Sequence, residues 1–222
     1  MSRLIKILLS IPRTILFNMR YLPINQAIKL PVWIASNVRV KRMHRGAIKG
    51  DLKRIGQIRI GYHEADAVDT YSAHTILDIH KGGVFQIKND AHIGHGAHIC
   101  IKSGAILSVG RHFAISGTTA IICSQKIFIG DEVQFSWDSL VMDSDAHKII
   151  DCDGELKENT KPITIGSHVW IAAKCTILKG STVPDNCVVG VNSLVNTRFS
   201  NTECIIAGAP AREIGKIGRW EL

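Results

Sequence analysis

The sequence has no CxxC pair, and its six cysteines show no spacing that is typical of a metal site. Two of them, Cys175 and Cys187, fall on small buried positions of the repeat described below. We therefore expect reduced, buried thiols in a cytoplasmic protein, with neither disulfides nor a bound metal.

A long uninterrupted hydrophobic run is also missing. Residues 3–19 are apolar and basic, but Lys6 and Arg13 interrupt the run and Pro12 lies in its middle. This segment is too broken for a membrane-spanning helix, and no small-residue cleavage site follows it as in a signal peptide. Two interpretations stay open: a helical cap on the domain, or a basic amphipathic segment that also touches anionic lipid at the inner membrane face.

The common signatures of nucleic-acid-binding proteins are absent as well. The chain has no RNA-binding signature, no zinc-finger spacing and no helix-turn-helix signal, although its net charge is +8 and its pI is near 9.3. A basic surface can instead serve anionic lipid or a phosphorylated small molecule, so nucleic acid is not expected as a partner. The length of 222 residues fits one domain with an appendage.

The sequence does contain a repeat with a period of six residues. From Ile165 onwards an aliphatic residue recurs at every sixth position, and a residue of small or moderate size follows four positions after each of the first five. The same spacing begins at Ile87 and continues after slips, which suggest small insertions at corners. Upstream of about residue 75 it dissolves, although Ile58 and Ile60 could open a first coil. The two series are Ile165, Ile171, Ile177, Val183, Val189 and Val195, and Val169, Cys175, Ser181, Cys187 and Ser193.

A period of six matches neither an α-helix nor a single long strand, but it fits short strands joined by tight corners. Three hexapeptides close a triangular coil of 18 residues, in which each aliphatic residue points inward. Gly94, Gly130, Gly166 and Gly190 follow inward residues, where a corner would use the freedom of glycine at positive φ. Because terminal coils need covers, the two ends of the chain are the expected caps. We predict an all-β parallel β-helix over residues 56–212, a capping segment over residues 1–55 and a tail over residues 213–222.

Three motifs carry a family resemblance. They are PITIGSHVWIAAKCTILKGSTVPDNCVVGVNSLV at residues 162–195, IIAGAPAREI at residues 205–214, and DSDAH at residues 143–147. With them, residues 85–215 resemble the hexapeptide-repeat acyltransferases, particularly the galactoside, maltose and polysaccharide O-acetyltransferase branch. The resemblance implies a left-handed coil, a homotrimer, active sites at crevices between subunits, and acetyl-CoA as the acyl donor without a metal.

A charged loop over residues 143–161 breaks the repeat, and an insertion of this kind in a compact fold is usually functional. His147 lies where this family carries its catalytic histidine. A neutral imidazole can take the proton of a hydroxyl as the oxygen attacks a thioester. Asp143 and Asp145 are the candidates for the carboxylate that would orient His147.

The resemblance also implies a cofactor site. Trp170 corresponds to a tryptophan beside the crevice for coenzyme A, and the small side chains that follow it would leave backbone groups open to the pantetheine arm and to the oxyanion. Arg212 matches the basic residue that usually faces the phosphates, which suits a guanidinium. The predicted cofactor-binding residues are Trp170, Ala172, Ala173, Val191, Asn196, Thr197 and Arg212.

The sequence departs from the family at two positions. Thr118 stands where relatives that acetylate galactosides carry an acceptor-binding asparagine, and Ala172 stands where a glycine usually follows the tryptophan motif. The first departure puts a galactoside acceptor in doubt. The expected acceptor is therefore stated only as a hydroxyl, or less favourably an amine, of a sugar or glycan precursor, as in polysaccharide biosynthesis.

Two other functions stay open. His74, His80, His92 and His98 are spaced by six, twelve and eighteen residues, and the γ-class carbonic anhydrases bind zinc through histidines on such coils. An 18-residue coil would stack His74 over His92 and His80 over His98. The H-x4-H pair of that family is missing, however, which favours outer-surface histidines over a zinc hydratase. A β-helix that only scaffolds an assembly is the other alternative.

Overall fold

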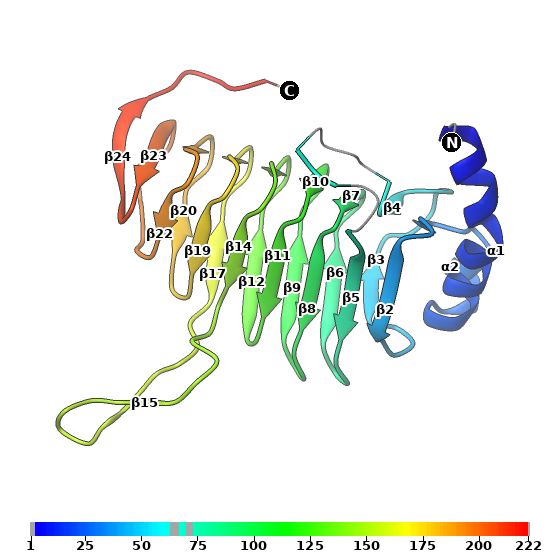
Figure 1. Cartoon of the computed structure of the whole chain (residues 1–222), viewed down its shortest axis with the longest axis horizontal. Coiled ribbons are helices and arrows are strands. Elements are labelled where there is room, and N and C mark those ends of the chain that lie inside the picture. The colour runs from blue at the N-terminus through cyan, green and yellow to red at the C-terminus, as the bar shows by residue number, and fades with distance from the viewer. Residues whose placement is uncertain (1–2, 63–66, 70–72, 222) are drawn as a thin grey trace.

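The computed structural model describes residues 3–62, 67–69 and 73–221. It is a parallel β-helix, as the repeat predicts, and it is left-handed, as the family resemblance implies. Figure 1 shows the coils stacked along the long axis of the molecule. The two helices, α1 (Arg3–Tyr21) and α2 (Ile24–Ala27), lie at the N-terminal end of this stack. None of the described helices is long and apolar enough to cross a membrane.

Three sheets form the faces of the triangular coil. Face A contains nine strands: β1 (Val32–Ile34), β4 (Ile58–Ile60), β7 (Ala91–His95), β10 (Phe113–Gly117), β13 (Gln134–Phe135), β18 (Trp170–Ile171), β21 (Val188–Val189), β23 (Cys204–Gly208) and β24 (Ala211–Lys216). Face B contains seven: β2 (Val38–Arg42), β5 (Thr75–Ile79), β8 (His98–Ile101), β11 (Ala120–Cys123), β14 (Leu140–Met142), β19 (Thr176–Leu178) and β22 (Leu194–Val195). Face C contains six: β3 (Ile48–Gly50), β6 (Val84–Ile87), β9 (Ile106–Val109), β12 (Lys126–Ile129), β17 (Ile163–Ile165) and β20 (Thr182–Val183).

The chain visits the faces in the order A, B, C, so each coil has an A–B, a B–C and a C–A corner. Neighbouring strands within a face pair in parallel, except for the antiparallel pair of β23 and β24. The antiparallel β24 covers the last coil, so the predicted tail begins as a strand. A second antiparallel pair, β15 (Ile149–Ile150) and β16 (Leu156–Lys157), lies outside the coil.

The 18-residue coil holds in the C-terminal part only. Ile165 pairs with Val183, and Ile171 with Val189, so both pairs are 18 positions apart. Upstream, Ile93 pairs with Ile115, which is 22 positions on, because strands there have four or five residues. From Ile165 onwards both predicted series are buried, since these coils turn the same positions inward.

Glycine serves a different purpose from the one predicted. Gly94, Gly130, Gly166 and Gly190 do not have positive φ; a Cβ added at Gly94 would lie 2.2 Å from the carbonyl oxygen of Ser116 on the next coil. The close approach of neighbouring coils therefore excludes a side chain there. Positive φ at the corners is adopted instead by other glycines, among them Gly82, Gly96 and Gly180, and by non-glycine residues, including His112, Glu132, His168 and Asn186 on the C–A corner.

The first coil begins at Val32, upstream of the predicted boundary at residue 56. Val32 pairs with Ile58, 26 positions on, and this irregular coil length hides the repeat from the sequence. Helix α1 covers the exposed edge of β1. The side chain of Asn18 accepts a hydrogen bond from the N–H of Val32 (3.2 Å) and donates one to its carbonyl (2.7 Å), and Thr14 accepts from Ile34 (3.2 Å). The N-terminal helix therefore packs on the first coil, where the sequence predicts a cap.

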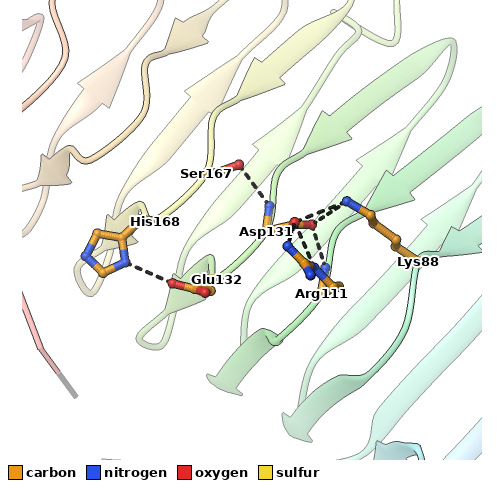
Figure 2. A network of polar contacts seen from close by, with 6 residues as sticks. All are labelled: Lys88, Arg111, Asp131, Glu132, Ser167 and His168. Atoms are coloured by element: carbon orange, nitrogen blue, oxygen red, sulfur yellow. Dashed lines mark hydrogen bonds and ion pairs between the residues drawn. The ribbon is translucent and has the colours of Figure 1, made fainter.

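A charged network ties three coils together beside the C–A corner, as Figure 2 shows. The carboxylate of Asp131 accepts hydrogen bonds from the backbone N–H (2.9 Å) and the guanidinium (2.8 Å) of Arg111 and pairs with Lys88 (3.1 Å). The backbone N–H of Arg111, assisted by both cations, lowers the pKa of Asp131 to about 2. The network therefore stabilises the corner by joining Asp131 to cations from two other coils.

Replacing Asp131 with asparagine is expected to lower the free energy of unfolding by about 1–2 kcal/mol at neutral pH, given its partial exposure. The folded pKa lies below the unfolded value, so this stabilisation is present above about pH 4 and is lost as the pH falls towards 2. Thermal unfolding of both proteins between pH 7 and pH 2 measures it. A difference that does not shrink at low pH would contradict the ionic origin.

Candidate active site

The 143–161 loop leaves the coil after β14 and returns before β17, at the B–C corner. Figure 1 shows its hairpin, formed by β15 and β16, projecting away from the coils. Backbone hydrogen bonds close its base, from Asp145 to Asn159 (2.8 Å) and from Lys161 to Asp143 (3.0 Å). His147 is exposed on the outgoing arm just beyond this base, and its ring has no hydrogen-bond partner in the described part of the chain. The imidazole is therefore free to meet a ligand.

Asp143 does not orient His147. The side chain is fully buried, and its carboxylate accepts hydrogen bonds from three backbone N–H groups, those of Ser124 (2.6 Å), Gln125 (2.9 Å) and Lys126 (2.8 Å). Because the carboxylate is fully buried and held by these groups, the exposed imidazole of His147 cannot reach it. The carboxylate instead holds the turn that begins β12, which is a structural role that local sequence did not reveal.

Asp145 is also engaged elsewhere. Its carboxylate lies 2.5 Å from the ammonium of Lys179, which also donates to the carbonyl of Glu158 (2.6 Å). This bridge fastens the loop to the coil below it. Within one chain, neither predicted carboxylate contacts His147.

The predicted cofactor residues fall into two groups. Trp170, Ala172, Ala173 and Val191 lie on or beside the A–B corner, whereas Asn196 and Thr197 lie at the B–C corner, two coils beyond the coil that carries the loop. Arg212 lies on β24 at the C-terminal end of face A, where it is exposed and forms no ion pair with any described residue. A single chain therefore does not gather these residues into one pocket.

Only some backbone N–H and C=O groups beside Trp170 are available to bind a ligand. The N–H of Ala172 donates to the carbonyl of Val189 (2.9 Å), and its own carbonyl accepts from Ser139 (3.2 Å), so both groups are occupied. The N–H of Ala173, by contrast, has no acceptor among the described residues. Of the two alanines, Ala173 is the one that can offer a donor to an oxyanion.

Sequence reasoning missed two contacts, one at the A–B corner and one beside the C–A corner. The hydroxyl of Thr118 donates to the carboxylate of Asp138 (2.5 Å), which occupies the equivalent turn one coil later. Trp220 from the C-terminal tail stacks on His168 with ring centres 4.6 Å apart, and its centroid lies 6.4 Å from that of Trp170. The coil spacing could have signalled the first contact. Only the folded tail reveals the second.

The predicted histidine ladder does not form. The register pairs His92 with Arg59 and Ala114, and His98 with Ile76 and Ala120. The stacks fail because these coils have more than 18 residues.

One cluster among the described residues has metal-ligating groups, with ligand atoms of Asp78, His80 and Cys100 all within 4.8 Å of one another. The guanidinium of Arg42, however, already binds Asp78 through two hydrogen bonds (2.6 and 2.7 Å) and lowers its pKa. Burial raises the pKa of Cys100 and favours the protonated thiol. We therefore assign this cluster as a partly buried ion pair between Asp78 and Arg42.

No protein-family model matches the chain. It is 31% identical to galactoside O-acetyltransferase of Escherichia coli K12 over 118 residues, which are 51% of this chain and 56% of that protein. It is 29% identical to polysialic acid O-acetyltransferase of Escherichia coli O1:K1 over 144 residues, 64% of this chain and 43% of that protein. The chain thus spans about half the length of the curated relatives it matches.

Solved structures share the fold. The polysialic acid-specific acetyltransferase NeuO superposes with a TM-score of 0.61 at 19% identity, covering 86% of this chain and 79% of that one. A hexapeptide-repeat acetyltransferase from Vibrio cholerae gives a TM-score of 0.50 at 23% identity, covering 62% and 75%. The resemblance to the galactoside and polysaccharide O-acetyltransferase branch is confirmed, and with it the β-helical fold.

Proposed function

We propose that this protein is an acetyl-CoA-dependent O-acetyltransferase that acts on a hydroxyl of a sugar or glycan precursor. The observation that carries the proposal is the placement of the candidate residues on the two edges of face B. The loop with His147 lies at its B–C edge, and Trp170 with the two alanines lies beside its A–B edge. The curated relatives, which are acetyltransferases, support the same activity.

A homotrimer would bring the two edges together. From β11 onwards the outward side chains of face B carry no charge, and they are half-buried in a single chain. They are Ala120, Ile122, Leu140, Met142, Thr176, Leu178 and Leu194. If three such faces surround a three-fold axis, each A–B corner meets the B–C corner of its neighbour. His147 of one subunit then faces Trp170 and Ala173 of the next.

The chemistry follows from this arrangement. Acetyl-CoA supplies the thioester that is attacked. The free imidazole of His147 takes the proton of the acceptor hydroxyl as its oxygen attacks, and later returns a proton to the departing thiolate. The open N–H of Ala173 is placed to donate a hydrogen bond to the oxyanion of the tetrahedral intermediate. Small side chains at residues 172 and 173 leave room for an extended substrate beside the exposed indole of Trp170.

Arg212 is the proposed phosphate contact of the donor. Replacing it with alanine is expected to weaken coenzyme A binding about tenfold, because a charge-assisted pair with phosphate is lost. Binding of 3′-dephospho-coenzyme A should change much less if the contact is to the 3′-phosphate. Calorimetric titration of both ligands measures the two losses. Equal losses would place the contact elsewhere on the cofactor.

A screen of sugars and nucleotide sugars with acetyl-CoA, read as released thiol, tests the activity and identifies the acceptor class. Light scattering tests the trimer, which should have three times the mass of the 24.4 kDa chain. Absence of thiol release with every acceptor, together with absence of coenzyme A binding, would contradict the proposal. The proposed location is the cytoplasm, at the inner face of the membrane.

A further inference from the structure

Helix α1 is buried on one face and exposes apolar side chains on the other. Thr14, Phe17 and Asn18 are buried against the first coil. The opposite face exposes Leu8, Leu9, Pro12, Ile15 and Leu16, whose i, i+1, i+4, i+7, i+8 spacing forms a single stripe along the helix. The helix therefore presents a second apolar stripe that no described residue covers.

This stripe belongs to a larger surface at the N-terminal end of the β-helix. Helix α2 lies beside α1 (Figure 1). Ile55, in the turn before β4, joins the same end, because the N–H of the adjoining Gly56 bonds to Leu30 after α2 (3.1 Å). Eight aliphatic side chains at this end are each between 37% and 68% exposed, and we call them the N-terminal apolar surface. They are Leu8, Leu9, Ile11, Ile15, Leu16, Ile24, Ile28 and Ile55. Aliphatic surface gathered in this way usually marks an interaction site.

The charge of the chain is concentrated at the same end. Residues 1–62 contain thirteen Lys and Arg but a single acidic residue, Asp51. The remaining residues contain fourteen Lys and Arg and eighteen acidic residues, so the net positive charge of the protein comes from its N-terminal part. Exposed Arg20, Lys29 and Arg54 lie among the residues of the N-terminal apolar surface. An apolar surface with basic residues around it fits a layer of anionic headgroups over hydrocarbon.

We infer that the N-terminal apolar surface docks the protein on an anionic phospholipid bilayer, with α1 lying in the plane of the interface. One helix thus serves as both cap and lipid contact, through opposite faces. A second copy of the chain is disfavoured as the occupant, because it would bring two strongly basic ends together.

The inference builds on the proposed inner-membrane location but not on the proposed chemistry. In the proposed trimer all three N-terminal ends lie on the same side, since the three-fold axis runs along the coils. Three weak lipid contacts then act together and raise the apparent affinity. Docking would hold the proposed active sites near acceptors that are assembled on the membrane.

Sedimentation of the full-length protein with phosphatidylethanolamine vesicles that contain phosphatidylglycerol tests the inference. Leu16→Glu should lower the partition coefficient by about tenfold or more, because an acidic group replaces an inserted aliphatic one. The matched control is Ile214→Glu at the opposite end of the β-helix; Leu16 is 64% exposed and Ile214 is 65% exposed. Ile28→Glu, on the same surface but outside α1, repeats the test if Leu16→Glu disturbs the cap.

We expect the full-length protein to bind these vesicles at low salt, to leave them as salt is added, and to ignore pure phosphatidylcholine. Ile214→Glu should bind like the unchanged protein, and Leu16→Glu should keep its turnover on soluble acceptors. Failure to bind, or equal losses in all variants, would overturn the inference. A soluble assembly would also overturn the inference if Leu16→Glu dissociates it and vesicles do not. The N-terminal apolar surface would then join copies of the chain. Absence of turnover in every protein would count against the proposed function alone.

Discussion

Replacing His147 with alanine is expected to lower turnover by about 10²–10⁴-fold, the usual contribution of general-base assistance. Coenzyme A binding and the oligomeric mass should stay unchanged, because the exposed ring has no hydrogen-bond or ion-pair partner among the described residues. Steady-state release of thiol measures the loss. His112→Ala is the control, since His112 is an exposed histidine on the C–A corner, paired with Asp90 (2.9 Å) and far in the coil from the loop. Near-normal turnover of His147→Ala would remove this residue from the mechanism.

An active site shared between neighbouring subunits predicts a second result for His147→Ala. If His147 acts on substrate bound at Ala173 of the neighbouring subunit, mixed trimers of His147→Ala and Ala173→Glu chains contain some interfaces with both native residues. Co-expression of the two inactive variants should therefore restore part of the turnover. Mixtures that stay inactive, although mixed trimers form, would place the whole site within one chain.

Replacing Phe17 with alanine is expected to lower the free energy of unfolding by about 3–5 kcal/mol, through lost burial and the cavity that remains. Phe17 is 3% exposed and belongs to the core, where α1 covers the first coil. Its neighbour Leu16 points away from the coil, so Leu16→Ala should change stability by less than about 0.5 kcal/mol. Thermal unfolding of both variants measures the contrast.

Small and equal effects at Phe17 and Leu16 would contradict the cap. A loss confined to Phe17, combined with a loss of vesicle binding confined to Leu16→Glu, would establish that the two faces of α1 have separate tasks. The sequence left cap and lipid contact as alternatives because its apolar residues surround most of the helix. The packing of α1 on β1 separates them.

The sequence predicted the position of the loop, but not the contacts that its residues make with the coils. The break in the repeat at residues 143–161 places His147 on a loop, because a charged segment cannot continue the buried series. The partners of Asp143 and Asp145 lie on other coils, namely the turn before β12 and Lys179. Such contacts depend on how coils stack, and residues near His147 in the sequence carry no signal for them.

The sequence by itself determined the β-helix, since each inward position must be apolar at a spacing that strands and corners set locally. Ile165, Ile171 and Ile177 are fully buried as their period requires. Coil length was decided by the tertiary structure, because strands of variable length shift the register, which removed the histidine ladder and hid the first coil. The tertiary structure also divided the candidate site between two corners and stacked Trp220 on His168. These features arise where distant segments meet, and a local period carries information only about neighbours along the chain.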